Sequence, residues 1–186
     1  MGISQSLAIL LWSVFELGLL LGRRSREKVR KADRSSLRYI WLVILLGNTS
    51  GIYFGMARIG YLSSWSVVLY WTGIGLILAG LVFRAVAILQ LKKFFTVDVV
   101  LHEDHRLIRS GLYGILRHPS YSGSLLSFIG LGVSFANWLS TLVVALPILC
   151  IFLYRIRIEE AALQSHFGQE YRDYMARTKR LIPFIY

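Results

Sequence analysis

The sequence has a single cysteine, Cys150, and only three prolines among 186 residues. One cysteine cannot form a disulfide within the chain, and it excludes a metal site built from several cysteines. The chain also lacks internal repeats and low-complexity linkers. We therefore predict a single domain over residues 1–186.

Long apolar runs are abundant. Hydrophobic residues make up 55% of the chain and the mean hydropathy is +0.57. A helix of about 20 apolar residues spans the hydrocarbon core of a bilayer, and Asn137 marks a tight turn between the last two runs. We predict an all-α integral membrane protein with about five transmembrane helices. The five runs are Ile3–Gly22, Tyr39–Ala57, Ser64–Leu89, Ser120–Phe135 and Trp138–Tyr154.

Acidic residues are scarce: ten Asp and Glu stand against 21 Lys and Arg, a net charge of +11. All basic residues except Arg58 fall within 23–38, 84–117 and 155–180, close to the ends of the apolar runs. Basic residues gather on the cytoplasmic side of membranes and attract anionic lipids. The pattern predicts an N-terminus outside, a cytoplasmic C-terminus, and membrane lipids rather than nucleic acid as partners.

The two halves of the chain differ in polarity. Residues 1–91 supply three spans, in which Glu16 and Arg84 should turn inward, snorkel or pair. Residues 92–186 contain all four histidines and combine an interfacial segment, a helical hairpin and a C-terminal tail. A functional site is therefore expected in this second half.

The interfacial segment Lys92–Arg117 is too charged to span a membrane, and we expect turns at Gly111 and Gly114. His102 and His105 lie within it without a cysteine or a second ligand cluster. Such a pair is typical of a solvated loop. We predict no metal site.

The tail has helical spacing. Two interpretations remain open. The aromatic residues of the tail either pack it onto the interfacial segment while Glu160 pairs with Arg157, or the charged residues from Arg155 to Glu160 line a polar pocket at the membrane boundary. The residues that share one predicted helix face are Glu160, Leu163, Phe167, Tyr171, Tyr174 and Thr178.

Two stretches carry a family resemblance. "GLYGILRHPSYSG" (Gly111–Gly123) and "RIRIEEAALQSHFGQEYRDYMARTKRLIPF" (Arg155–Phe184) resemble the isoprenylcysteine carboxyl methyltransferase family and related membrane methyltransferases, including phospholipid N-methyltransferases. Three linked motifs at matched spacing carry this resemblance. The first 90 residues or so carry no motif.

The resemblance implies a helical membrane enzyme that binds S-adenosylmethionine in a cytoplasmic pocket formed by the C-terminal helical segments and takes a lipophilic methyl acceptor from the bilayer. Arg155 or Arg157, with Glu160, would lie nearest the acceptor. No glycine fingerprint of a dinucleotide-binding fold follows a strand here, which argues against the soluble methyltransferase fold. The implied cofactor-binding residues are His118, Pro119, Tyr121, Glu160, Tyr171, Tyr174 and Arg180.

Several acceptors and functions stay open. A carboxyl group, as on a prenylated cysteine or similar lipophilic acid, is already ionised at neutral pH and needs only a cation to orient it. The amine of a phospholipid must first lose a proton, so Glu160 or His118 would serve as general base. The arginines favour the acid. Less favoured alternatives are a nicotinamide-dependent membrane reductase with a similar Arg-His-Pro-x-Tyr element and a non-enzymatic membrane scaffold.

Overall fold

The computed structural model describes residues 2–22, 31–95 and 106–182. Within these ranges the secondary structure is helical and contains no strand, in agreement with the predicted all-α class. Residues 96–105, with His102 and His105, lie outside the described residues. The α-helices are α1 (Ile3–Gly22), α2 (Lys31–Ala57), α3 (Ser66–Leu91), α4 (Pro119–Ser134), α5 (Trp138–Phe167) and α6 (Gln169–Arg177), and the 3₁₀ turns are η1 (Ser63–Trp65), η2 (Lys92–Phe94) and η3 (Gly111–Gly114).

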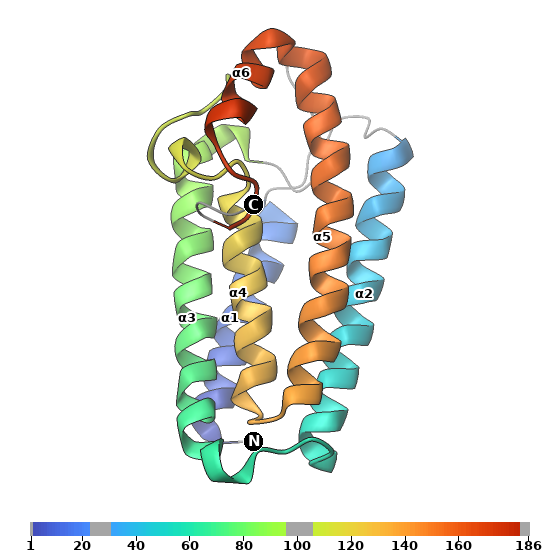
Figure 1. Ribbon diagram of the computed structural model, residues 1–186, viewed down its shortest axis with the longest axis vertical. Coiled ribbons are helices and arrows are strands. Elements are labelled where there is room, and N and C mark those ends of the chain that lie inside the picture. Colours follow the sequence, from blue (N-terminus) through green and yellow to red (C-terminus); the bar gives the residue numbers. More distant parts are fainter. Residues whose placement is uncertain (1, 23–30, 96–105, 183–186) are drawn as a thin grey trace.

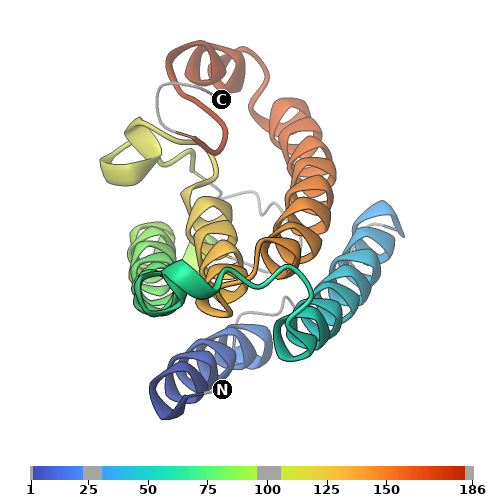
Figure 2. The same cartoon turned by 60° about the horizontal axis from the view of Figure 1, so that its bottom comes forward.

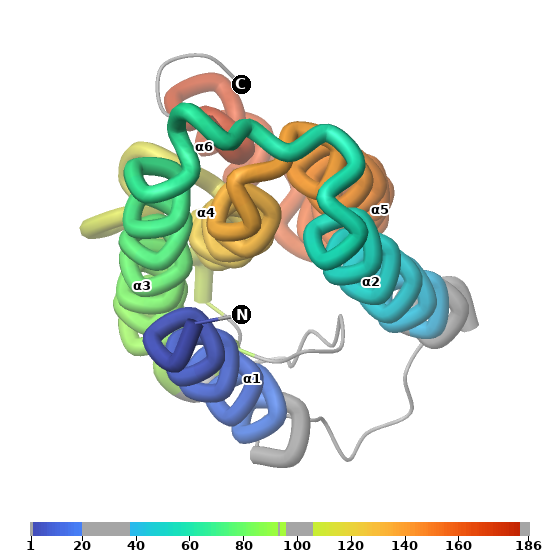
Figure 3. Tube along the Cα trace, turned by 90° about the horizontal axis from the view of Figure 1, so that it is seen from below, coloured from blue at the N-terminus to red at the C-terminus, as the bar shows by residue number. Residues whose placement is uncertain are grey.

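The five long helices lie along the long axis of the molecule, and α6 folds over one end (Figure 1). Viewed along this axis, α4 lies between α3 and α5, with α1 beside α3 and α2 beside α5 (Figure 3). The polar half of the chain therefore supplies the central helix α4 and the end cap α6.

Three helices are long and apolar enough to cross a membrane, over Arg38–Ala57, Ser63–Leu91 and Trp138–Phe167. The apolar part of α1, Ile3–Leu19, is shorter. Helix α4 has 16 residues, a rise of about 24 Å. It lies between α3 and α5 and contains three glycines and five serines, which allow close helix contacts. An integral membrane protein is thus supported; α1 has the 20 residues of a predicted span, whereas α4 is shorter than a full crossing.

Helices α3 and α4 pack with their backbones in close contact at glycines. A Cβ atom on Gly73 would lie 2.3 Å from Ser134 N, and one on Gly130 would lie 2.7 Å from Gly73 O. Gly80 and Gly123 pack in the same way. A Cβ on Gly80 would lie 2.5 Å from Gly123 O, and one on Gly123 would lie 2.7 Å from Gly80 O. These contacts fix the position of the start of α4 relative to α3.

Asn137 forms the turn between α4 and α5, as predicted. Its Oδ1 accepts a hydrogen bond from Ser140 N at 3.0 Å, which caps α5. Its Nδ2 donates to Phe54 O and Ile59 O at the end of α2. One buried side chain thus ties together three helices at the end of the bundle opposite to α6.

The tail does not form the single helix that its spacing predicts. Helix α5 continues past Tyr154 to Phe167 and ends at Gly168, which has a φ of +57°. This left-handed backbone is accessible to glycine at little cost and turns the chain into α6. The predicted face from Glu160 to Thr178 is therefore divided between two helices and the segment that follows them.

The segment after α6 returns to the start of α4 (Figures 1 and 2). Arg117 N donates to Lys179 O at 2.7 Å, and Lys179 N donates to Ile115 O at 3.0 Å. His118 N donates to Arg180 O at 3.1 Å. The sequence motifs around residues 117 and 180 are thus joined through their backbones.

Candidate active site

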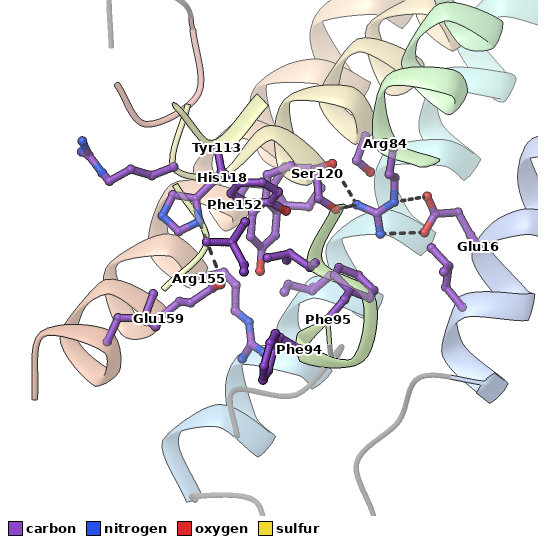
Figure 4. Close-up of a pocket in the computed structure, with 18 of the residues that line it drawn as sticks. Glu16, Arg84, Phe94, Phe95, Tyr113, His118, Ser120, Phe152, Arg155 and Glu159 are labelled. Carbon is purple, nitrogen blue, oxygen red and sulfur yellow. Dashed lines mark hydrogen bonds and ion pairs between the residues drawn. The ribbon is translucent and has the colours of Figure 1, made fainter. Parts of the chain in front are cut away.

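A cavity of about 520 Å³ lies inside the bundle, at the end that α6 covers. Helices α1 to α6 all contribute side chains to its wall, together with η3. Figure 4 shows the side chains that converge on it. The lining residues used below are Trp12, Glu16, Leu17, Ile40, Trp41, Ile44, Arg84, Tyr113, His118, Ser120, Tyr121, Phe128, Phe152, Arg155, Glu159, Tyr171 and Tyr174.

One end of the cavity is polar and enclosed. His118, at the start of α4, is 4% exposed and Arg155, on α5, is 1% exposed. His118 Nδ1 lies 4.0 Å from Glu159 Oε2. Glu159 also interacts electrostatically with Arg155. This end therefore places a cation, a carboxylate and an imidazole around one space.

Much of the remaining wall is apolar and comes from the two N-terminal helices, with the charged pair Glu16–Arg84 on the side of α1 and α3. Trp12 and Leu17 come from α1, and Ile40, Trp41 and Ile44 come from α2. A hydrocarbon chain gains roughly 0.8 kcal/mol for each methylene that such a surface removes from water. The cavity can therefore hold a molecule with a polar head and a long apolar tail.

Aromatic rings line the cavity where it meets the hydrophobic core of the bundle. Trp12 packs edge-on against Phe128 with ring centroids 4.7 Å apart. Phe152 packs edge-on against Tyr121 at 5.1 Å. Such aromatic pairs are rigid and exclude water. They separate the cavity from the core of the bundle.

Glu160 lies beside the cavity and is not among its lining residues. Its Oε1 accepts from Arg117 Nε at 2.8 Å, and its Oε2 accepts from Arg180 Nε at 2.9 Å. His118 Nε2 lies 3.4 Å from Oε1. Arg117 also donates to the carbonyls of Met175 and Thr178. We call these three charged residues, Arg117, Glu160 and Arg180, the tail clamp, because they join α4, α5 and the C-terminal segment.

Three tyrosines close the polar end. Burial raises the pKa of Tyr113 and of Tyr171, and it raises the pKa of Tyr174 to about 12. Tyr174 donates its hydroxyl hydrogen to Tyr113 O at 2.7 Å. These phenols are therefore neutral at physiological pH, and their rings offer π faces to a bound cation.

The predicted site residues divide into two groups. His118, Tyr121, Arg155, Tyr171 and Tyr174 line the cavity, whereas Pro119, Arg157, Glu160 and Arg180 are not among the residues that line it. Pro119 begins α4, where a proline costs no hydrogen bond. Arg157 is exposed. One of the two interpretations paired Glu160 with Arg157, and this is wrong. Glu160 pairs with Arg117 and Arg180 instead.

Two residues of this region, Arg117 and Tyr113, were not singled out from the sequence, although Arg117 is the first residue of the Arg-His-Pro motif. Glu159 belongs to the charged run from Arg155 to Glu160 that one interpretation placed in a polar pocket. Successive residues on a helix point about 100° apart, so only one of two adjacent glutamates can face a given cavity. Glu16 was expected to turn inward, snorkel or pair, and it pairs with Arg84.

The fold and the cavity define an integral-membrane protein with an internal site that is polar at one end and apolar at the other. The model of the isoprenylcysteine carboxyl methyltransferase (ICMT) family matches residues 73–165, half of the 186-residue chain. The chain belongs to this family. The matched segment contains α4 and most of α3 and α5.

Named relatives agree with this assignment. The chain is 35% identical over 122 residues to a probable protein-S-isoprenylcysteine O-methyltransferase of Oryza sativa subsp. indica, covering 62% of this chain and 64% of the relative. It is 35% identical over 115 residues to protein-S-isoprenylcysteine O-methyltransferase B of Arabidopsis thaliana, covering 61% and 58%. The chain thus spans about three fifths of the length of these relatives.

A solved structure is also similar. The eukaryotic intramembrane Ras methyltransferase ICMT superimposes with a TM-score of 0.55 at 28% sequence identity. The match covers 86% of this chain and 55% of that one. The similarity therefore extends beyond the segment matched by the family model and includes most of the helical bundle.

Proposed function

We propose that the chain is a membrane-embedded, S-adenosylmethionine-dependent methyltransferase that methylates the carboxyl group of a lipophilic acid, of which an S-prenylated cysteine is the type. The observation that carries this proposal is the continuity of the cavity. His118, Arg155 and Glu159 line one part of it, apolar side chains of α1 and α2 line another, and both parts face a single space. The names of the relatives and of the similar structure support this substrate class.

The chemistry of the polar end suits the proposed cofactor. S-adenosylmethionine carries a sulfonium, an ammonium, a carboxylate and a flat base, and it supplies the methyl group when bound. The rings of Tyr121, Tyr171 and Tyr174 match the sulfonium and the base. Glu159 and His118 match the ammonium and carboxylate. Glu160, Arg180 and Pro119 would support this site from outside the cavity.

The position of Arg155 suits a carboxyl acceptor, and Glu160 is unsuited to act as the base that an amine acceptor needs. An ammonium acceptor needs a general base, and a carboxylate held by two guanidinium groups is a poor proton acceptor. Glu160 is bound in this way by Arg117 and Arg180. A carboxylate acceptor needs no base, only a cation that orients it, and Arg155 fits this role better than the exposed Arg157.

An enclosed site suits methyl transfer. The donor loses positive charge and the acceptor loses negative charge as the bond forms, so a water-poor environment favours the reaction. The remaining task is alignment of the two reacting groups. His118 and Arg155, each less than 5% exposed, would provide that alignment from rigid positions on α4 and α5.

The proposed topology places the polar end of the cavity at the cytoplasmic surface, with the N-terminus outside. Cationic side chains around this end, such as Arg106, Arg157 and Arg177, are exposed. They would attract anionic lipid head groups. The acceptor's apolar tail would then enter sideways from the bilayer, between the residues of α1 and α2 that line the cavity.

A transfer assay with two acceptors tests the proposal. The purified protein in liposomes is given methyl-labelled S-adenosylmethionine with an N-acetylated S-prenylcysteine or with phosphatidylethanolamine. We expect a base-labile methyl ester on the acid and no labelled amine lipid. Labelling of phosphatidylethanolamine alone would support the N-methyltransferase alternative. Absence of both products, with calorimetric binding of reduced nicotinamide, would indicate a reductase, and absence of any binding a scaffold.

A further inference from the structure

A partly buried ion pair forms the wall of the cavity on the side of α1 and α3. Arg84 Nε lies 2.8 Å from Glu16 Oε1, and Arg84 Nη2 donates to Glu16 Oε2 at 3.0 Å. The side chains of Arg84 and Glu16 are 14% and 22% exposed. Figure 4 shows this pair on the opposite side of the cavity from His118, Arg155 and Glu159.

Each nitrogen of the Arg84 guanidinium lies close to an oxygen atom. Its remaining nitrogen, Nη1, donates to Ser120 O at 3.0 Å and lies 3.2 Å from Ser120 Oγ. A bidentate carboxylate cancels most of the field of an arginine, and this matters most where water is excluded. With Glu16 in place, the α1 side of the cavity therefore presents little net charge to a ligand.

We propose that Glu16 determines where an acidic ligand places its carboxylate, by neutralising Arg84. Without Glu16, the guanidinium would be an uncompensated cation in the cavity wall. It would draw the carboxylate toward α1 and away from the end where His118, Arg155 and Glu159 lie. Glu16 is thus a positioning residue that sets where the acceptor's carboxylate lies in the cavity. This inference rests on the proposed function.

Glu16 lies outside residues 73–165, which the family model matches, so the assignment comes from this chain's own geometry. A purely structural role, in which the pair only anchors α1 to α3, makes a different prediction. Loss of an anchor lowers stability without regard to the ligand's charge. Loss of a neutralising charge changes the preference between an acid and its uncharged analogue.

The test compares binding of an N-acetylated S-prenylcysteine with binding of its primary carboxamide, by calorimetry in detergent. In the Glu16→Gln variant we expect the ratio of acid to amide affinity to rise by about fivefold, because the field of Arg84 is no longer cancelled. In the transfer assay, KM for the acid and kcat should both fall. Glu16→Asp should give a smaller shift, and Glu16→Gln combined with Arg84→Gln should restore the wild-type ratio.

Gln5→Ala provides the matched control. Gln5 Nε2 donates to Ser134 Oγ at 2.7 Å and holds the other end of α1 without adding charge. We expect lower thermal stability and an unchanged acid-to-amide ratio. An unchanged ratio in Glu16→Gln, or in the uncharged variant Glu16→Ser if the first does not fold, overturns the proposal.

The binding experiment separates this inference from the proposed function. A raised ratio in a protein that transfers no methyl group would support the role of Glu16 and contradict the activity. Methylation of the acid with an unchanged ratio would support the activity and contradict the role of Glu16.

Discussion

Glu159 and Glu160 are neighbours in the sequence and lie in different surroundings. Glu159 lines the cavity, with its side chain 31% exposed. Glu160 is 4% exposed and bound by two arginines. One carboxylate is therefore available to a ligand and the other holds the tail in place. Substitutions at the two positions should differ accordingly.

Glu160→Gln should destabilise the attachment of the tail. The substitution leaves Arg117 and Arg180 without their shared anion, and breaking a buried ion pair typically costs about 3 kcal/mol. We expect a lower melting temperature and faster protease cleavage after α5. Arg157→Gln, an exposed position on the same helix, is the control and should change stability by less than about 0.5 kcal/mol. Equal stability of the two variants would contradict the tail clamp.

Glu159→Gln should instead impair the reaction. The side chain is nearly isosteric, but it no longer carries the charge that interacts with Arg155 and His118. Removing one such electrostatic group typically lowers kcat/KM by about 100-fold. The melting temperature should stay within a few degrees of that of the wild type. A variant that is fully active would remove Glu159 from the proposed site.

Tyr174 gives a prediction for alkaline pH. Its pKa is raised to about 12, above the value of about 10 in the unfolded chain. A raised phenol pKa means that the folded state favours the neutral form. The contribution of Tyr174 to the free energy of unfolding is therefore complete below pH 10 and is lost as the pH rises toward 12. The difference in phenolate absorbance between the wild type and Tyr174→Phe should therefore appear near pH 12. A step near pH 10 would contradict burial of this hydroxyl.

At the scale of the elements, glycines set how closely helices α3 and α4 approach. A Cβ on Gly73 would meet the backbone of Ser134, whereas a Cβ on Gly75 of the same helix would have no neighbouring atom within 4 Å. The same residue type thus has a packing role at one position and none two residues later. Periodicity alone does not distinguish them.

Gly73→Ala should separate α3 from α4. Overpacking against a backbone atom typically costs about 2 kcal/mol, and the shift would displace the end of α4 near Ser134. Gly75→Ala is the matched control and should be neutral or slightly stabilising, because alanine is the better helix former. Thermal unfolding followed by helical circular dichroism measures both. Similar melting temperatures for the two variants would contradict the close packing.

The sequence predicted the elements better than their ends. The apolar runs gave the positions of the long helices, and Asn137 gave the turn between α4 and α5. The tail was predicted as one helix because its 3.6-residue period continues through Gly168. Gly168 is itself a local signal for a helix end, because glycine readily adopts a positive φ, but the continuing period outweighed it in the prediction.

At the scale of the whole molecule, the cavity combines parts of the chain with very different sequence signals. The motifs around residues 117, 160 and 180 indicated that these segments meet, since they resemble one family. Helices α1 and α2 carry no motif and are apolar on most sides, so nothing in their pattern identifies which face lines a cavity. The sequence predicted that Glu16 would turn inward, snorkel or pair, but it did not place Glu16 or Trp41 in the wall of a cavity.

The proposed topology can be tested by labelling. In a Cys150→Ala background, single cysteines at Ser63 and Ser165 place exposed thiols at opposite ends of the bundle. In intact cells an impermeant maleimide should label the cysteine at 63, and the cysteine at 165 should react only after the membrane is opened. The reverse pattern would contradict an external N-terminus.

The proposed reaction requires that cofactor and acceptor meet in the cavity between α1 and α6. A structure of the protein with S-adenosylhomocysteine and an N-acetylated S-prenylcysteine would show whether they do. We predict the cofactor sulfur and the acceptor carboxylate facing one another near His118 and Arg155, across a gap that a methyl group would fill, with the prenyl chain along Trp41. A cofactor bound outside this cavity, or a carboxylate turned away from it, would contradict the proposed reaction.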